Sequence, residues 1–198
     1  MILFGINFNA YFLLLTRKFK QLFKIEEIRV YLGVIAVFTT LIAFNVRGCF
    51  GSLRESFHHS LFQVASIITT TGFSTVDFNQ WPAFSKLLLV LLMFIGASPG
   101  STGGGIKPTT FFVLMQEVRS IFSKRRLGAF RRRLPEESLT KAATITLLGT
   151  IVVFVGTFVL CVLEPQHSFV QLLFEQISAY STAGLTMGIT PSLHAASK

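Results

Sequence analysis

The sequence SIITTTGFST at residues 66–75 returns as SAYSTAGLTM at residues 178–187. The two copies align at an offset of 112 positions, so that Gly72 meets Gly184. Each copy follows a long apolar segment and then a short amphipathic one. Because a repeat of this length reflects one structural unit used twice, the sequence predicts two copies of the same backbone arrangement.

The composition is typical of a protein that lies in lipid. Of the 198 residues, 51% are hydrophobic and only 14% are charged, which is unlike a soluble domain. The formal net charge of +9 is concentrated between apolar spans, without a nucleic-acid-binding motif, so nucleic acid is not an expected partner. The positive-inside rule instead predicts a multi-pass protein of the cell (inner) membrane whose basic loops are cytoplasmic. Two groups hold thirteen of the 18 basic residues: Arg17, Lys18, Lys20, Lys24 and Arg29, and Arg119, Lys124, Arg125, Arg126, Arg131, Arg132, Arg133 and Lys141.

Each copy of the repeat is preceded by one spanning segment and one half-length segment. Residues 30–46 and 142–163 are long enough, at about 1.5 Å per residue, to cross most of a ~30 Å hydrocarbon core. Residues 56–67 and 168–179 are too short to span but long enough to dip halfway into the bilayer. We therefore expect an outer helix followed by a re-entrant pore helix in each copy.

Start signals support the two pore helices. Ser168 with Gln171 three residues later fits a capping box, and Ser56 is the predicted N-cap of the other helix. The predicted fold class is an all-α membrane protein with repeated helix, re-entrant pore-loop and helix units around a central pore. The domain division that follows is residues 1–29 (end of a preceding repeat plus a basic linker), 30–123 (a complete repeat), 124–141 (a basic linker) and 142–198 (an incomplete final repeat).

The segments around Gly72 and Gly184 carry the chemistry expected of a cation filter. A ring of main-chain carbonyls replaces the water shell of a cation without a fixed charge that would trap it. Glycine adopts positive φ freely and lets consecutive carbonyls turn toward one axis. The alternative is that small residues merely permit close helix packing, but the duplication favours a permeation pathway. The predicted potassium filter, which is the one metal site expected, consists of Thr69, Thr70, Thr71, Gly72, Phe73, Ser181, Thr182, Ala183, Gly184 and Leu185.

A glycine-rich break interrupts the second apolar span of the complete repeat. The span runs over residues 83–95, breaks at 96–105 and resumes to about residue 122. Irregular backbone at membrane depth is tolerated only where it is buried in protein or lines water, so we expect a gate across the permeation path. Its predicted residues are Gly100, Gly103, Gly104, Gly105 and Lys107.

Two alternatives bear on this break. Lys107 would oppose cation passage if it faced the pore, whereas the other interpretation has it snorkelling to the inner interface. A phosphate-binding loop is excluded, because Ile106 separates the last glycine from Lys107 and Pro108 follows.

His58 and His59 lack a carboxylate or cysteine partner at metal-ligand spacing, so we do not expect them to form a metal site. With no nucleophile and base pair visible in the spans, we expect neither an enzyme nor a bound cofactor.

These motifs resemble those of the Trk/Ktr/HKT superfamily of potassium transporters, specifically the bacterial TrkH/KtrB membrane subunits. In that family four helix, pore-loop and helix repeats surround one pore, with one filter glycine in each repeat. Gly72 looks like the third filter glycine and Gly184 like the fourth, and residues 98–107 look like the intramembrane gating loop. Residues 2–15 look like the end of the second repeat.

The resemblance implies potassium uptake, with sodium as a possible coupling ion. It also implies a homodimer of membrane subunits bound to a cytoplasmic ring of nucleotide-binding regulatory subunits. Because two filters are missing, the alternative is a truncated, non-conducting membrane fragment that acts only in assembly with other chains. A third arrangement, two such chains completing one four-loop pore, is disfavoured because the helix expected after Lys198 is absent.

Overall fold

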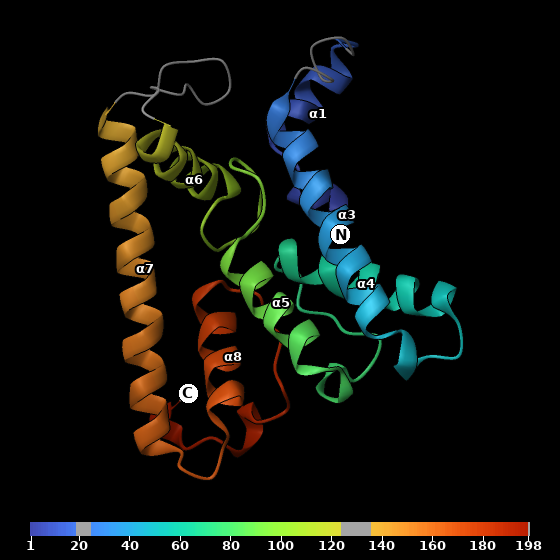
Figure 1. Ribbon diagram of the computed structural model, residues 1–198, viewed down its shortest axis with the longest axis vertical. Helices are drawn as coiled ribbons and strands as arrows, with labels where there is room; N and C mark the ends of the chain where they lie inside the picture. The colour runs from blue at the N-terminus through green and yellow to red at the C-terminus, as the bar shows by residue number, and fades with distance from the viewer. Residues whose placement is uncertain (19–24, 124–135, 198) are drawn as a thin grey trace.

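The computed structural model describes residues 1–18, 25–123 and 136–197 (Figure 1). Over these ranges the chain is helical, and the one pairing of extended backbone is an isolated bridge between Ile95 and Ile106. The basic residues at positions 20, 24, 124–126 and 131–133 lie outside these ranges.

Two long helices have the length and composition of membrane spans. Helix α3 comprises Glu26–Asn45 and helix α7 comprises Glu136–Leu163. Their apolar portions are Glu27–Asn45 and Leu139–Leu163. At 1.5 Å per residue, α7 is about 42 Å long. Large apolar side chains cover its outer surface, as a lipid-facing helix requires: Leu147, Phe154, Phe158 and Val162 are all exposed.

Helix α7 corrects one sequence-based boundary. We predicted that residues 124–141 form a linker, but α7 already begins at Glu136. Residues 136–141 contain good helix formers such as Glu and Lys and no proline, so the helix continues into polar sequence beyond the apolar span.

The two half-length helices are α4 (Leu53–Ile68) and α8 (Phe169–Tyr180). The capping box at Ser168 is confirmed: its side chain accepts from the Gln171 N–H, and the Gln171 side chain accepts from the Ser168 N–H at 3.0 Å. The prediction of Ser56 as the other N-cap is wrong. Helix α4 starts a turn earlier, where the Ser52 hydroxyl accepts from the Glu55 N–H at 3.2 Å.

Helix α5 (Ala83–Phe94) lies between the two half-length helices (Figure 1). Helix α3 packs on α4, α8 packs on α7, and α5 contacts both α4 and α8. The core at this junction consists of Ile67, Ile68, Leu89, Leu92, Met93 and Phe174, none of which has exposed surface. This shared core holds the two half-length helices in one unit.

The remaining elements are short or flank the core. Helix α6 (Pro108–Ser123) packs on α7. Residues 2–15, which we expect to be the end of a preceding repeat, form the 3-10 helix η1 (Ile2–Gly5) and helix α1 (Phe8–Leu15). The break falls at Asn7, whose side chain accepts from the Asn9 N–H at 2.9 Å and starts α1 anew. Further 3-10 turns are η2 (Arg47–Cys49), η3 (Phe78–Gln80), η4 (Thr190–Ser192) and η5 (Ala195–Ser197).

A carboxylate after α7 fastens the last segment of the chain. Glu164 has no exposed surface. It accepts from the His194 N–H and from Gln166 Nε2, each at 2.6 Å. The Ser197 hydroxyl and the His194 N–H hold the pKa of Glu164 below its ordinary value. The Ser197 hydroxyl lies outside ordinary hydrogen-bond geometry, so the His194 contact is the firmer one.

We expect the stabilising effect of Glu164 to depend on pH. A carboxyl group whose pKa is lowered by folding contributes stability above its unfolded pKa and loses it as the pH falls through the folded pKa. Wild type should therefore melt at a higher temperature than Glu164→Gln at neutral pH, and the difference should vanish in acid. Thermal unfolding from neutral pH to about pH 3 measures this, with the exposed Glu55→Gln as control. A difference that persists unchanged in acid would contradict it.

Candidate functional site

The repeated sequences form the same turn at the ends of α4 and α8. In the first bend (residues 69–73) the Thr70 N–H donates to Ile67 O at 3.0 Å and the Thr71 N–H donates to Ser66 O at 2.9 Å. In the second bend (residues 181–185) the equivalent donors bond Ala179 O at 3.1 Å and Ser178 O at 2.9 Å. This pair of bonds is a Schellman turn, which ends a helix by satisfying its last carbonyls.

The residue at the turning point of each bend is a threonine in the left-handed region. Thr70 has φ of 51° and Thr182 has φ of 55°. A β-branched residue is rare there, where a Schellman turn normally has glycine, so the backbone is strained at both positions. Sequence reasoning missed this strain. The sequence does carry a signal for this strain. In each copy the glycine comes two residues after the turning point, so a threonine has to adopt the left-handed conformation.

The two glycines lie side by side where the bends meet. Gly72 has φ of 78° and Gly184 has φ of 73°, as expected of glycine in such a turn. A Cβ atom placed on Gly72 would lie 2.6 Å from Ala183 O, and one on Gly184 would lie 4.0 Å from the Gly72 Cα. The main chains of the two bends are therefore in contact, although 112 positions separate these glycines in the sequence.

Hydroxyl groups at the helix ends brace the bends. The Thr69 hydroxyl donates to Ala65 O at 2.6 Å and lies 2.7 Å from the Thr71 hydroxyl. In the second copy the Ser181 hydroxyl donates to Ile177 O at 2.7 Å. The hydroxyls of Thr69 and Ser181 therefore each bond back to their own helix and hold the loop that follows it.

The two bends differ in how their side chains are covered. Along the second bend buried and exposed residues alternate, with Ala183 and Leu185 buried. In the first bend Phe73, which occupies the position of Leu185, is 65% exposed. Burial of the apolar side chains in the second bend leaves the main chain as its polar surface.

The glycine loop (residues 96–107) touches both bends. The Gly96 N–H donates to Ile106 O at 2.9 Å and the Ile106 N–H donates to Phe94 O at 3.1 Å, which closes the neck of the loop. At its far side the Gly104 N–H donates to the Thr70 hydroxyl at 3.3 Å. A Cβ atom on Gly104 would lie 2.4 Å from Ser181 O, so only glycine fits against the second bend.

Lys107 points into its own loop. Its ammonium group donates to Gly103 O. The positive charge of Lys107 is therefore directed at a main-chain carbonyl of its own loop.

The rest of the glycine loop is attached to the N-terminal segment. The Ser98 N–H donates to Gly5 O at 3.2 Å, and the Phe8 N–H donates to Gly100 O at 2.9 Å. The Thr102 hydroxyl reaches Phe4 O at 3.3 Å.

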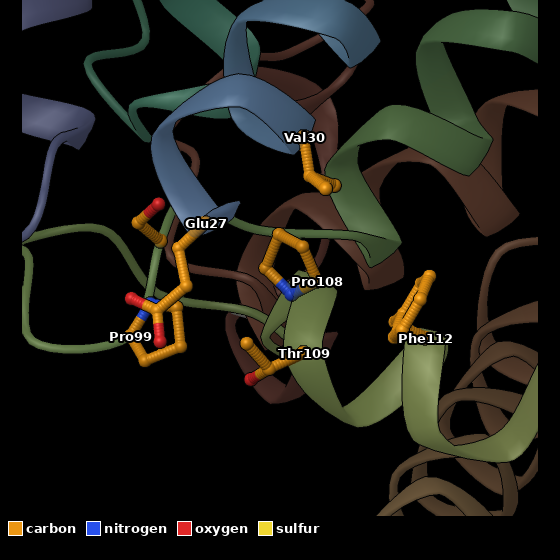
Figure 2. Close-up of a pocket in the computed structure, with 7 residues that line it drawn as sticks. Glu27, Val30, Pro99, Pro108, Thr109 and Phe112 are labelled. Atoms are coloured by element: carbon orange, nitrogen blue, oxygen red, sulfur yellow. The ribbon is translucent and has the colours of Figure 1, made fainter. Parts of the chain in front are cut away.

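A carboxylate from α3 lies beside this attachment. Figure 2 shows Glu27, in the first turn of α3, reaching toward Pro99 of the loop, with Pro108 and Thr109 at the start of α6 nearby. Glu27 also accepts from the Asn7 side chain at 3.2 Å. The start of α3, the N-terminal segment and the glycine loop therefore meet at one place.

The described ranges contain no cluster of three or more His, Cys, Asp and Glu side chains that is placed to hold a metal ion. His59 stacks on Phe50 with ring centroids 5.1 Å apart, and its Nδ1 lies 3.2 Å from the Thr75 hydroxyl.

The geometry predicts unequal responses to alanine at the two glycines. Both substitutions place a Cβ at positive φ, which costs about 1–2 kcal/mol. At Gly72 the new atom also meets a main-chain oxygen of the other bend, whereas at Gly184 it reaches only van der Waals distance. We expect Gly72→Ala to lower the melting temperature of the detergent-purified protein clearly more than Gly184→Ala. Equal or reversed shifts would argue against the contact between the bends.

Comparison with known proteins places this geometry in a wider group. A family model described as TrkH, a cation transport protein, matches residues 4–198. The Ktr system potassium uptake protein B of Bacillus subtilis is 34% identical over 203 residues, which cover 98% of this chain and 45% of that protein. The potassium/sodium uptake protein NtpJ of Enterococcus hirae is 36% identical over 128 residues, which cover 63% of this chain and 28% of that protein.

A solved structure has the same fold. The crystal structure of the potassium transporter TrkH from Vibrio parahaemolyticus matches with a TM-score of 0.81 at 22% identity, covering 98% of this chain and 43% of that one. This likeness confirms the predicted fold class, an all-helical membrane protein with pore-loop units. The chain spans less than half the length of these relatives.

Proposed function

The chain belongs to the TrkH family of cation transport proteins, as its sequence motifs predicted, and we propose that the intact protein takes up potassium ions across the cell membrane. Because this family consists of cation transport proteins, the prediction that the chain is not an enzyme is confirmed. The observation that carries the proposal is the contact between two glycine bends, each at the end of a half-length helix.

In this proposal the two bends supply two sides of a potassium filter. The carboxyl ends of α4 and α8 lead into the two bends, and their helix dipoles place partial negative charge where a cation would lose water. Carbonyl oxygens from residues 69–73 and 181–185 replace that water. The Bacillus relative named for potassium uptake supports potassium as the transported ion, and the Enterococcus relative named for both ions is consistent with sodium as the proposed coupling ion.

The glycine loop is the proposed gate. Its contact with both bends, through Gly104, supports a position directly beside the filter. Lys107 carries the positive charge that opposes cation passage while the loop stays in place. The remaining proposed gate residues are Gly100, Gly103 and Gly105.

The proposed setting is a multi-pass protein with cytoplasmic basic loops. A homodimer of membrane subunits and a ring of nucleotide-binding regulatory subunits are the proposed partners. The name "Ktr system" of the Bacillus relative supports a membrane subunit that works within a larger system.

The second candidate function is that of a non-conducting membrane fragment that acts only with other chains. The observation that favours it is that this chain spans 45% of the Bacillus relative. Growth of uptake-deficient bacteria on limiting potassium separates the two: rescue by the 198 residues alone supports conduction, and rescue only by an extended reading frame supports the fragment.

We expect an acidic side chain at either filter glycine to abolish or invert the preference for potassium. In the intact protein, Gly72→Asp or Gly184→Asp puts a fixed charge where neutral carbonyls are proposed to select the ion. The measurement is uptake of potassium against sodium in cells. The control is Gly48→Asp, because a Cβ atom there meets nothing within 4 Å. Unchanged selectivity in both filter variants would remove the filter assignment.

Shortening the glycine loop should raise basal potassium flux. Deletion of residues 103–105 removes both the Gly104 contact with Thr70 and the carbonyl that holds Lys107. Lys107→Met tests the same barrier with the main chain intact. Flux into vesicles without regulatory subunits reports the result, and an unaltered rate in both variants would argue against a gate.

A further inference from the structure

We propose that Glu175 and Gln63 are positioning residues behind the two filter bends, and that the carboxylate of Glu175 fixes the second bend with a charge that the first bend lacks. This inference rests on the proposed function, because it concerns how tightly the filter binds potassium. Both residues come from the half-length helices and stand at equivalent positions of the repeat.

Glu175 binds the chain just past the second bend through both carboxylate oxygens. Oε1 accepts from the Met187 N–H at 2.9 Å and from the Thr186 hydroxyl. The Thr190 hydroxyl lies 2.9 Å from Oε2 and 2.8 Å from the Thr186 hydroxyl, so its single proton has two acceptors within reach. The Thr186 hydroxyl in turn accepts from the Gly188 N–H at 2.9 Å. One carboxylate on α8 therefore holds the exit of the second bend.

In the first repeat, Gln63 makes one contact with the chain just past the first bend. The Ser74 hydroxyl, equivalent to that of Thr186, lies 3.0 Å from Gln63 Oε1. It also donates to Val76 O at 2.6 Å, so its single proton has two acceptors within reach. Gln63 has no exposed surface, and its Nε2 has no hydrogen-bond partner among the residues that the structure describes. The first bend is therefore held by a weaker and neutral contact.

The difference has a physical consequence for the second bend. Hydrogen bonds to a charged acceptor are roughly twice as strong as neutral ones. Residues 186 and 187 follow Gly184 by two and three positions, so bonds that immobilise them limit how far the proposed filter carbonyls can turn. The inward-facing Leu185 and Met187 are already buried, so the carboxylate acts on a segment that packing has placed in register.

The experiment measures potassium uptake by the intact protein in uptake-deficient bacteria, with the KM for potassium and the maximal rate determined separately. Glu175→Gln keeps the shape of the side chain but replaces one acceptor oxygen by a donor. We expect its KM to rise about tenfold, in line with the loss of a charge-assisted bond. A purely structural role would lower the amount of protein and hence the maximal rate, with KM unchanged. The matched control is Glu55→Gln, which removes an exposed carboxylate from the other half-length helix.

A double-substitution cycle tests whether the effect acts through Thr186. If Glu175 positions the bend through this hydroxyl, Thr186→Val should also raise the KM, and the double variant should show less than the product of the two changes. A KM that stays at the wild-type value in Glu175→Gln, or fully independent effects in the cycle, would overturn the inference. Wild type that fails to take up potassium at all would instead overturn the proposed function, and this inference with it.

Discussion

The contact between two glycine bends is the constraint on which the rest of the structure depends. Main chain can meet main chain there only because Gly72 presents no side chain to Ala183 O. For the bends to meet, α4 and α8 must end at the same depth, and the shared core around α5 fixes that depth. The long helices α3 and α7 then support α4 and α8 from outside. The architecture is therefore organised around two short loops.

Two of the three non-glycine residues with positive φ in the described ranges lie in these bends, and the third is Arg17 after α1. Thr70 and Thr182 adopt positive φ, and each is held there by main-chain bonds to the last turn of its own helix. Strained residues persist where the surroundings over-determine them. The Thr70 hydroxyl also accepts from the glycine loop, so that the strained turn and the loop share a hydrogen bond. Duplication of the strain at both bends argues that it belongs to the repeated unit.

The sequence predicted this organisation through patterns that have a local physical cause. Hydrophobic length indicated α3 and α7, and Ser168 with Gln171 indicated the start of α8, because a capping box depends on neighbouring residues alone. The prediction for Ser56 was wrong because Ser52 offers the same hydroxyl one turn earlier, while the Ser56 hydroxyl donates back to Ser52 O at 3.1 Å. The break at Asn7 was not predicted either, because Asn7 lies among apolar residues and its role as an N-cap is not evident from the sequence.

Features that depend on contacts distant in the sequence were beyond sequence reasoning. The meeting of Gly104 with both bends joins the glycine loop to turns in both repeats. The repeat predicted that the two bends are alike. It could not predict their differences, such as the exposure of Phe73 against the burial of Leu185.

The closed neck of the glycine loop has a mechanical consequence. The bridge between Ile95 and Ile106 ties the last turn of α5 to the residues that lead into α6, so the enclosed residues are bounded at both ends by rigid elements. The enclosed residues are also bonded to Gly5, Phe8 and Thr70, so displacing the segment requires several hydrogen bonds far apart in the sequence to break together.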